Sequence, residues 1–164
     1  MFERAIKRSK EYKNLMKIIS DSEQLLKDTI AKKSDKVAKA IADAHYHATS
    51  LNRYNDENSL SCAITMAYYT AKNSYMIIRE LPSGVGYADV VFIPRHDVID
   101  KPAIVIELKC NQNEVTAIDQ IKDRKYGESL KDYIGKILLV GINYDKNDKD
   151  KKHTCVIEEL EKTE

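Results

Sequence analysis

The sequence predicts an α/β fold in which helices come first and strands dominate the remainder. Up to about residue 72, apolar residues recur at helical spacing behind helix-starting signals. From Tyr75 onward, short runs rich in β-branched and aromatic residues alternate with turns. At 164 residues and 43% hydrophobic, the chain is long enough for one well-packed domain with a helical appendage.

The first part of the chain predicts two helices in succession. Residues 4–19 form an irregularly amphipathic pattern that favours a helix. Residues 20–23, Ser-Asp-Ser-Glu, resemble a capping box. In this motif the side chain of the first residue accepts a hydrogen bond from the backbone amide of the glutamate, and the glutamate side chain accepts one from the backbone amide of the first residue. We therefore expect a second helix to open there and run through Leu25, Leu26 and Ile30.

Two further helices are expected before the strands. Ser34 is a plausible cap for a third helix, and Asn55 or Asp56 for a fourth over residues 57–72. Each has an apolar face at helical spacing: Val37, Ile41, Ala44, His45 and Ala48 in the third, and Leu60, Ile64 and Ala67 in the fourth.

The rest of the chain predicts strands with one helix among them. Glycine and proline mark turns between the apolar runs, and a charged turn without hydrophobic residues at 145–152 precedes the last run. The expected strands cover residues 75–80, 87–93, 103–109, 136–142 and, at the periphery, 153–158, with a helix over 114–132 that turns Ala117, Ile118, Ile121 and Leu130 inward.

Three charged residues stand at the ends of apolar strands. Asp89 lies in the second predicted strand, and Glu107 and Lys109 lie in the third. If these strands pair antiparallel about the loop at 94–102, Asp89 falls within a residue or two of the other two. Because side chains alternate along a strand, Glu107 and Lys109 share one face, opposite Ile106 and Leu108.

Divalent-metal chemistry offers one explanation of these charges. Charged groups are rarely buried unless they are paired or bind a metal. A hard cation between two carboxylates lets both stay ionised, and magnesium can activate one of its waters against a phosphodiester. Lys109 would then orient that water or stabilise the developing charge. Spacing alone supports equally well a structural Asp89–Lys109 salt bridge with Glu107 at a solvated strand end.

The same residues resemble a known family signature. Residues 86–89 (Gly-Tyr-Ala-Asp) and 106–109 (Ile-Glu-Leu-Lys) are similar to the D...ExK motif of the PD-(D/E)xK nuclease superfamily, also called restriction-endonuclease-like. Ala88 departs from the proline in the superfamily's name, which removes no metal ligand. The region from about 54 to 157 resembles the nuclease-like domain at the C-terminus of many bacterial AAA-ATPase-like proteins of unassigned function. Similar blocks are residues 54–61, 78–82 and 120–122.

The resemblance implies a fold, a domain division and a set of site residues. The fold would be a restriction-endonuclease-like core of order α-β-β-β-α-β, with a mixed four- to five-stranded sheet. It would occupy residues 54–164, behind a helical N-terminal segment at 1–53. The implied metal ligands are Asp89, Glu107 and the carbonyl of Leu108, with Lys109 assisting the water nucleophile.

Two more residues are implied as support for the site. An acidic residue on the helix before the strands often helps to hold the metal in the resembled domains, which points to Glu57. Its place in the first helical turn is equally explained by the helix dipole. The family pattern also places a glutamine on the helix after ExK, here Gln120, which could otherwise be an ordinary surface residue.

The function implied by the resemblance is magnesium- or manganese-dependent hydrolysis of nucleic-acid phosphodiester bonds, with DNA expected rather than RNA. The alternative is a non-catalytic nucleic-acid-binding or regulatory module that serves an AAA-type ATPase region or partner. Lysine and arginine (27) nearly cancel aspartate and glutamate (26), which weighs against tight unaided DNA binding. A local basic cluster is still available at Lys122, Arg124, Lys125 and Lys131.

Other features set limits on function and location. No apolar run approaches a membrane span, and the N-terminus lacks the layout of a signal peptide, so we expect a cytoplasmic protein without a membrane partner. Cys62, Cys110 and Cys155 are odd in number and far apart, and we interpret them as free thiols, with Cys62 in the core. The oligomeric state is not indicated.

The histidines do not predict a metal site. His45 and His47 diverge on a helix, and His45 is expected to be a satisfied, partly buried residue. His153 and Cys155 share one face of a strand, which is too few ligands for zinc.

Overall fold

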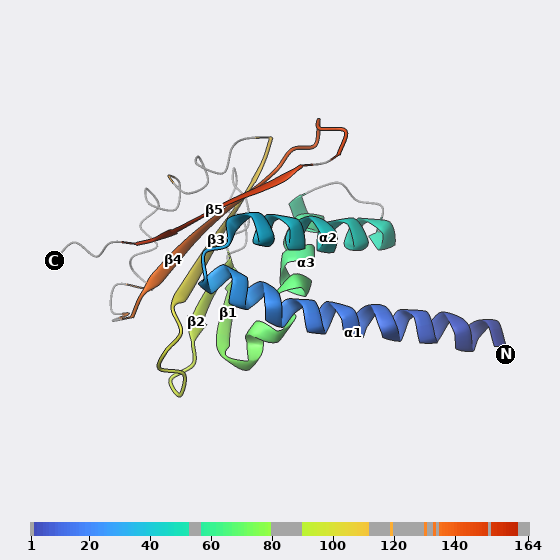
Figure 1. Cartoon of the computed structure of the whole chain (residues 1–164), viewed down its shortest axis with the longest axis horizontal. Helices are drawn as coiled ribbons and strands as arrows, with labels where there is room; N and C mark the ends of the chain where they lie inside the picture. Colours follow the sequence, from blue (N-terminus) through green and yellow to red (C-terminus); the bar gives the residue numbers. More distant parts are fainter. Residues whose placement is uncertain are drawn as a thin grey trace.

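A five-stranded mixed sheet with helices packed on one face forms the centre of the molecule (Figure 1). The computed structural model describes residues 2–52, 57–79, 90–111, 119, 130, 133, 135–150 and 152–160. The predicted α/β class with a mixed sheet is confirmed. Within the described ranges, no helix combines the length and apolar character that crossing a bilayer requires.

Helix α1 (Phe2–Ile30) is one continuous helix, so the predicted capping box in the middle of it is wrong. Ser22 is buried, and its Oγ lies 2.8 Å both from the carbonyl oxygen of Ile19 and from the hydroxyl of Thr70 in the 3₁₀ helix η1 (Tyr69–Asn73). A serine hydroxyl that bonds the preceding turn leaves the backbone helical. Ser22, inside the predicted box, therefore serves a tertiary contact, and the helix continues through Ser20, the residue predicted to cap it.

The end of α1 is closed by a left-handed residue. Lys32 has a φ of 57°, and the amide nitrogens of Lys32 and Lys33 donate to the carbonyls of Thr29 and Asp28 at 3.0 and 2.9 Å. This is the usual way to satisfy the last carbonyls of a helix, although glycine is the residue preferred at the left-handed position.

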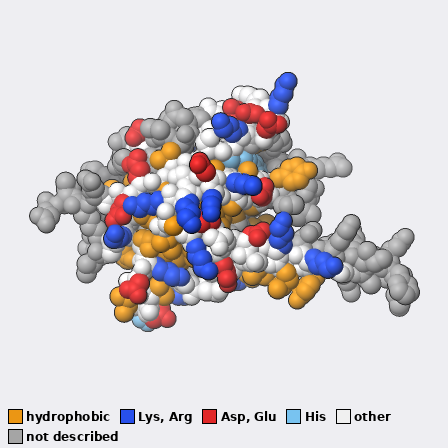
Figure 2. Space-filling view, viewed as in Figure 1, with side chains coloured by type: hydrophobic (Ala, Val, Ile, Leu, Met, Phe, Trp, Pro, Cys, Tyr) orange, Lys and Arg blue, Asp and Glu red, His pale blue; other side chains and the backbone are white. Residues whose placement is uncertain are grey.

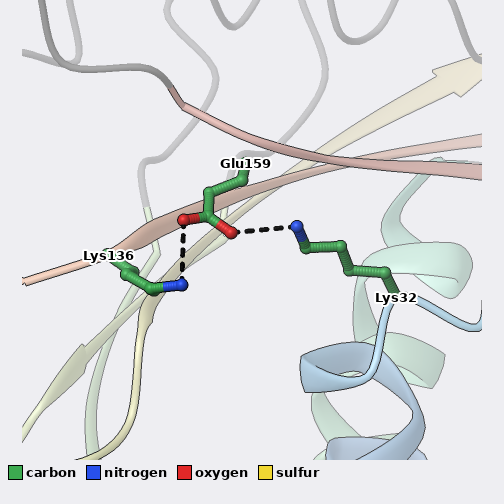
Figure 3. A network of polar contacts seen from close by, with 3 residues as sticks. All are labelled: Lys32, Lys136 and Glu159. Carbon is green, nitrogen blue, oxygen red and sulfur yellow. Dashed lines mark hydrogen bonds and ion pairs between the residues drawn. The ribbon is translucent and has the colours of Figure 1, made fainter.

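Glu159 ties this turn to the sheet. Its carboxylate lies between Lys32 Nζ at 2.9 Å and Lys136 Nζ at 3.2 Å, as Figure 3 shows. The two lysines hold the pKa of Glu159 below its usual value, chiefly through their hydrogen bonds. Because Lys136 directly precedes β4 (Ile137–Tyr144), the cluster joins the helical layer to the sheet.

Helices α2 (Ser34–Asn52) and α3 (Glu57–Ala67) begin where the sequence predicts. The fourth predicted helix ends early, at Ala67, and the chain tightens into η1, where the Ala71 amide donates to the Tyr68 carbonyl at 2.9 Å. The predicted apolar faces are confirmed where they are described: Ala44 is partly buried against the core, and the buried members are Val37, Ile41, His45, Leu60, Ile64 and Ala67.

Every strand of the sheet was predicted at nearly its observed position. The segment at 87–89 lies outside the described residues, and the fourth strand continues to Tyr144, two residues beyond its predicted end. The strands are β1 (Tyr75–Arg79), β2 (Val90–Pro94), β3 (Ala103–Cys110), β4 and β5 (His153–Glu159).

The strands lie in sequence order from β1 to β5, and one neighbouring pair is parallel. The predicted hairpin of β2 and β3 is antiparallel, with Val90 opposite Ile106. Strands β3 and β4 are parallel, which places Glu107 beside Gly141 and Lys109 beside Asn143. Strand β5 is an edge strand antiparallel to β4, as its predicted peripheral position requires.

Alternation along the strands gives the sheet two distinct faces. The helical face carries Ile104, Ile106 and Leu108 of β3, packed with α1, α2 and α3. The second face carries Val105 and its neighbours, and Leu130 packs there, as predicted for an inward position of the segment after β3. The apolar cluster of the second face consists of Val91, Ala103, Val105, Leu130, Ile137 and Leu139.

The prediction that Cys62 lies in the core is wrong, because its side chain is exposed. Among the side chains of α3 that the structure describes, the buried ones are Leu60, Ser61, Ala63, Ile64 and Ala67, and Cys62 is not one of them. Cys62, Cys110 and Cys155 form no disulfide with one another, as predicted, and Cys110 is buried.

Candidate functional site

The second face of the sheet changes from apolar to polar along β3 and β4. On β3, Ala103 and Val105 belong to the apolar cluster, and the next two positions on that face are Glu107 and Lys109. On β4, Leu139 is followed on the same face by Gly141 and Asn143. Because the two strands are parallel, both polar stretches lie at the same edge, where the strands end.

Glu107 and Lys109 form a buried ion pair at this edge. Lys109 Nζ lies 3.1 Å from Glu107 Oε1, and the two residues are 3% and 0% exposed. Residues two apart on a strand are separated by about 6.6 Å, a distance that the long lysine side chain can cross by bending back. The predicted placement of both side chains on one face is confirmed, with Ile106 and Leu108 in the helical core.

The salt-bridge alternative drawn from the sequence is wrong about Glu107. It placed that carboxylate at a solvated strand end, whereas its side chain is fully buried and faces Lys109. A carboxylate removed from water is costly unless it is paired or bound to a cation. Asp89, the other member of that alternative, lies outside the described residues.

The structure brings together part of the predicted site. Glu107, Lys109 and the backbone of Leu108 lie together on β3. Glu57 is the first residue of α3, and its side chain lies outside the described part of the chain. Asp89, Gln120 and the basic cluster Lys122, Arg124, Lys125 and Lys131 also lie outside it.

Sequence reasoning missed the contribution of β4. Asn143 is 5% exposed and is the register neighbour of Lys109 on the same face. On the next strand, β5, Thr154 is the register partner of Asn143, so Lys109, Asn143 and Thr154 are polar neighbours across three strands. A polar residue inside the otherwise apolar end of β4 was a usable signal, but the predicted strand stopped one residue short of it.

The donor chemistry on this face suits a hard divalent cation. Carboxylate and carbonyl oxygens are the ligands that magnesium and manganese prefer. The softer groups Cys110, Cys155 and His153 belong to the helical face of the sheet. Among the described residues no three His, Cys, Asp or Glu side chains gather in one place, so the described donors are Glu107 and the backbone of its strand.

A separate polar contact lies at the same end of the strands but on the helical face of the sheet. His45 Nδ1 of α2 and His153 Nε2 of β5 are 2.9 Å apart, and the His153 ring stacks on Tyr144 with centroids 4.9 Å apart. The prediction that His45 is satisfied is confirmed, although it is more deeply buried than expected. Burial raises the pKa of Tyr144.

Comparison with known proteins places the chain in a family. No curated protein matches the sequence at a significant level. Residues 55–154 match the family profile described as the PD-(D/E)XK nuclease superfamily. The matched range includes Glu107 and Lys109, and the mixed sheet with flanking helices is consistent with the restriction-endonuclease-like fold. Because the match covers well over half of the sequence, the chain belongs to the PD-(D/E)XK nuclease superfamily.

Proposed function

We propose that this protein is a magnesium-dependent nuclease that hydrolyses phosphodiester bonds, with DNA as the expected substrate. Family membership supports nuclease activity and a nucleic-acid substrate. The single observation that carries the proposal is the buried Glu107–Lys109 pair at the edge where β3 and β4 end. The pair supplies a carboxylate and an ammonium group whose facing atoms, Glu107 Oε1 and Lys109 Nζ, lie 3.1 Å apart.

We propose Asp89, Glu107 and the carbonyl of Leu108 as the metal ligands. Asp89 is bonded to Val90, whose register partner is Ile106, the residue before Glu107. This connectivity supports a second carboxylate close to the first. Bound magnesium or manganese would supply an activated water and neutralise charge on the phosphate.

The chain's own residues would orient and stabilise the reacting groups. Lys109 would orient the attacking water or stabilise negative charge that develops on the phosphate. Its ion pair with Glu107 supports this role, because it holds the ammonium beside the proposed ligand. Glu57 and Gln120 are proposed as supporting residues on the flanking segments.

The proposal also covers the cellular location of the protein and the division of the chain into domains. Three cysteines that form no disulfide with one another support a reducing, cytoplasmic location. The family match begins at residue 55, which supports a nuclease-like domain at 54–164 behind an N-terminal segment at 1–53.

A second candidate is a binding module without turnover that serves an AAA-type ATPase region or partner. Charge favours it: the chain has a net charge of +1, and Figure 2 shows lysines and acidic residues interspersed over the face formed by α1 and α2. Such a surface provides little electrostatic attraction for nucleic acid, so a partner would have to bring the substrate.

Plasmid nicking separates the two candidates. Supercoiled plasmid should be nicked or linearised with magnesium or manganese, and the reaction should stop with chelator. Glu107→Gln is the inactive control. Absence of cleavage on double-stranded, single-stranded and branched DNA and on RNA would favour the binding module.

A further inference from the structure

At the end of the second face where β3 and β4 finish, the polar residues are Glu107 and Lys109 on β3 and Asn143 on β4. Lys109 and Asn143 are register neighbours on parallel strands, and their side chains stand on the same face. Neighbouring strands lie about 4.8 Å apart, so the two side chains start side by side. Both are almost completely removed from solvent, at 3% and 5% exposure.

The amide of Asn143 has the chemistry to hold a lysine ammonium. Its carbonyl oxygen accepts hydrogen bonds and its nitrogen donates them, while the group carries no charge. An aspartate at this place would be a second anion competing with Glu107 for Lys109. A neutral amide can hold the ammonium and leave its ion pair with Glu107 at 3.1 Å intact.

Gly141 lies two residues before Asn143 on β4 and is the second feature of that strand that bears on the ion pair. It is the register neighbour of Glu107 and lies on the same face, so no side chain stands next to the carboxylate from that strand. Glycine inside a strand often marks a place where a ligand approaches closely. Strand β4 thus places a glycine beside Glu107 and a polar side chain beside Lys109.

We propose that Asn143 is a positioning residue that holds Lys109 in place beside Glu107. This inference rests on the proposed nuclease function for its catalytic consequence, but the coupling of Asn143 to Lys109 is a property of the protein alone. Asn143 acts through Lys109, so its loss should affect the turnover number more than substrate binding.

Steady-state kinetics on the nucleic acid that the wild type cleaves tests the catalytic part. Asn143→Leu, close in size but without polar atoms, should lower kcat about tenfold to a hundredfold with KM nearly unchanged, since misplacing a catalytic group is costly. Asn143→Gln, which keeps a neutral amide, should regain part of the lost kcat, whereas Asn143→Asp, which adds a second anion beside Lys109, should not. Ile142→Val, on the same strand but the other face, is the matched control and should leave both constants unchanged.

A double-mutant cycle in chelator tests the coupling without any reaction. The free energies of unfolding of wild type, Asn143→Leu, Lys109→Met and the double variant should be non-additive, because residues that act as a unit lose their interaction only once. The control cycle of Ile142→Val with Lys109→Met should be additive. If Lys109→Met does not fold, Lys109→Gln replaces it.

The outcomes separate this inference from the proposed function. Wild-type inactivity on every nucleic acid would defeat the proposed function, and the chelator cycle would still decide the coupling. Additive stabilities would overturn the positioning role. An active wild type whose kcat is unchanged by Asn143→Leu would also overturn it.

Discussion

The ion pair of Glu107 and Lys109 is the residue-scale feature on which the proposed site depends. Two charges taken out of water recover little net stability relative to apolar side chains, because desolvation offsets their attraction. Their neighbours on the same face, such as Val105, show that apolar residues pack well there. The pair is therefore better explained by chemistry than by stability.

Breaking the pair should cost more than removing both charges. Lys109→Met leaves a buried carboxylate without its cation and should destabilise the fold by about 3–5 kcal/mol. Glu107→Gln combined with Lys109→Met removes both charges and should cost clearly less. Urea unfolding at neutral pH in chelator measures both values. An equal loss in the single and double variants would show that Glu107 does not depend on Lys109.

The sequence predicted the residues of β3 and missed those of β4 for a physical reason. Period-2 alternation placed Glu107 and Lys109 on one face without any knowledge of the fold. Asn143 becomes part of the site only through the parallel register with β3, which no local pattern encodes. The prediction for Cys62 was wrong because it rested on the apolar character of cysteine and not on the direction in which this position points around the helix.

At the scale of elements, the contact of α1 with the residues around η1 shows how tertiary structure overrides local signals. Thr29 donates its hydroxyl to the carbonyl of Leu25 at 2.8 Å. A hydroxyl has one hydrogen, so in the 2.7 Å contact between Thr29 and Tyr68 the tyrosine must donate. The Ser22–Thr70 contact lies on the same side of α1. The second half of α1 is thereby fixed to the core.

This contact should make the fold sensitive to alkali. Burial raises the pKa of Tyr68 above its ordinary value near 10. Its contribution to stability is therefore complete below pH 10 and is lost as the pH rises above that value towards the folded-state pKa. Tyr68→Phe should cost about 0.5–1.5 kcal/mol at pH 7 and lose less stability than wild type above pH 10. Denaturant unfolding at pH 7 and at pH above 10 measures this, and parallel curves for the two proteins would contradict it.

The left-handed turn after α1 supports a second element-scale prediction. Lys32→Ala and Lys32→Gly both remove the ion pair with Glu159, but only glycine relieves the φ of 57°. Lys32→Gly should therefore be more stable than Lys32→Ala by about 1 kcal/mol. Thermal melts of the two variants make the comparison, with Lys136→Ala as the control for loss of a Glu159 partner alone. Equal melting temperatures for the two Lys32 variants would show that the turn is unstrained.

Strand positions followed from composition, whereas strand order did not. Runs of β-branched residues marked all five strands, and the short loop at 94–102 predicted the β2–β3 hairpin. The placement of β4 beside β3 requires a crossover of the intervening chain, so it could be expected only through family resemblance.

At the scale of the whole molecule, metal binding should appear as stability. A cation that binds only the folded state adds RT ln(1 + [L]/Kd), about 2.7 kcal/mol at a hundredfold excess over Kd. Wild type should therefore melt at a higher temperature with magnesium, and Asp89→Asn should lose that increment. Without metal, Asp89→Asn should be as stable as wild type or more so, since a repelling charge is removed. A wild type insensitive to metal, with a markedly destabilised Asp89→Asn, would contradict the metal-site assignment.

The parallel pairing of β3 with β4 also has a consequence for the order of events during synthesis. Every residue of β3 leaves the ribosome before the first residue of β4, and the pair at Glu107 and Lys109 gains its β4 neighbours only when that later strand docks. Contacts distant along the chain form late in folding. A nascent chain that ends at Lys136 would contain the whole ExK motif but could not enclose it. Competence of the site is therefore expected to arise only after β4 has been made and has docked beside β3.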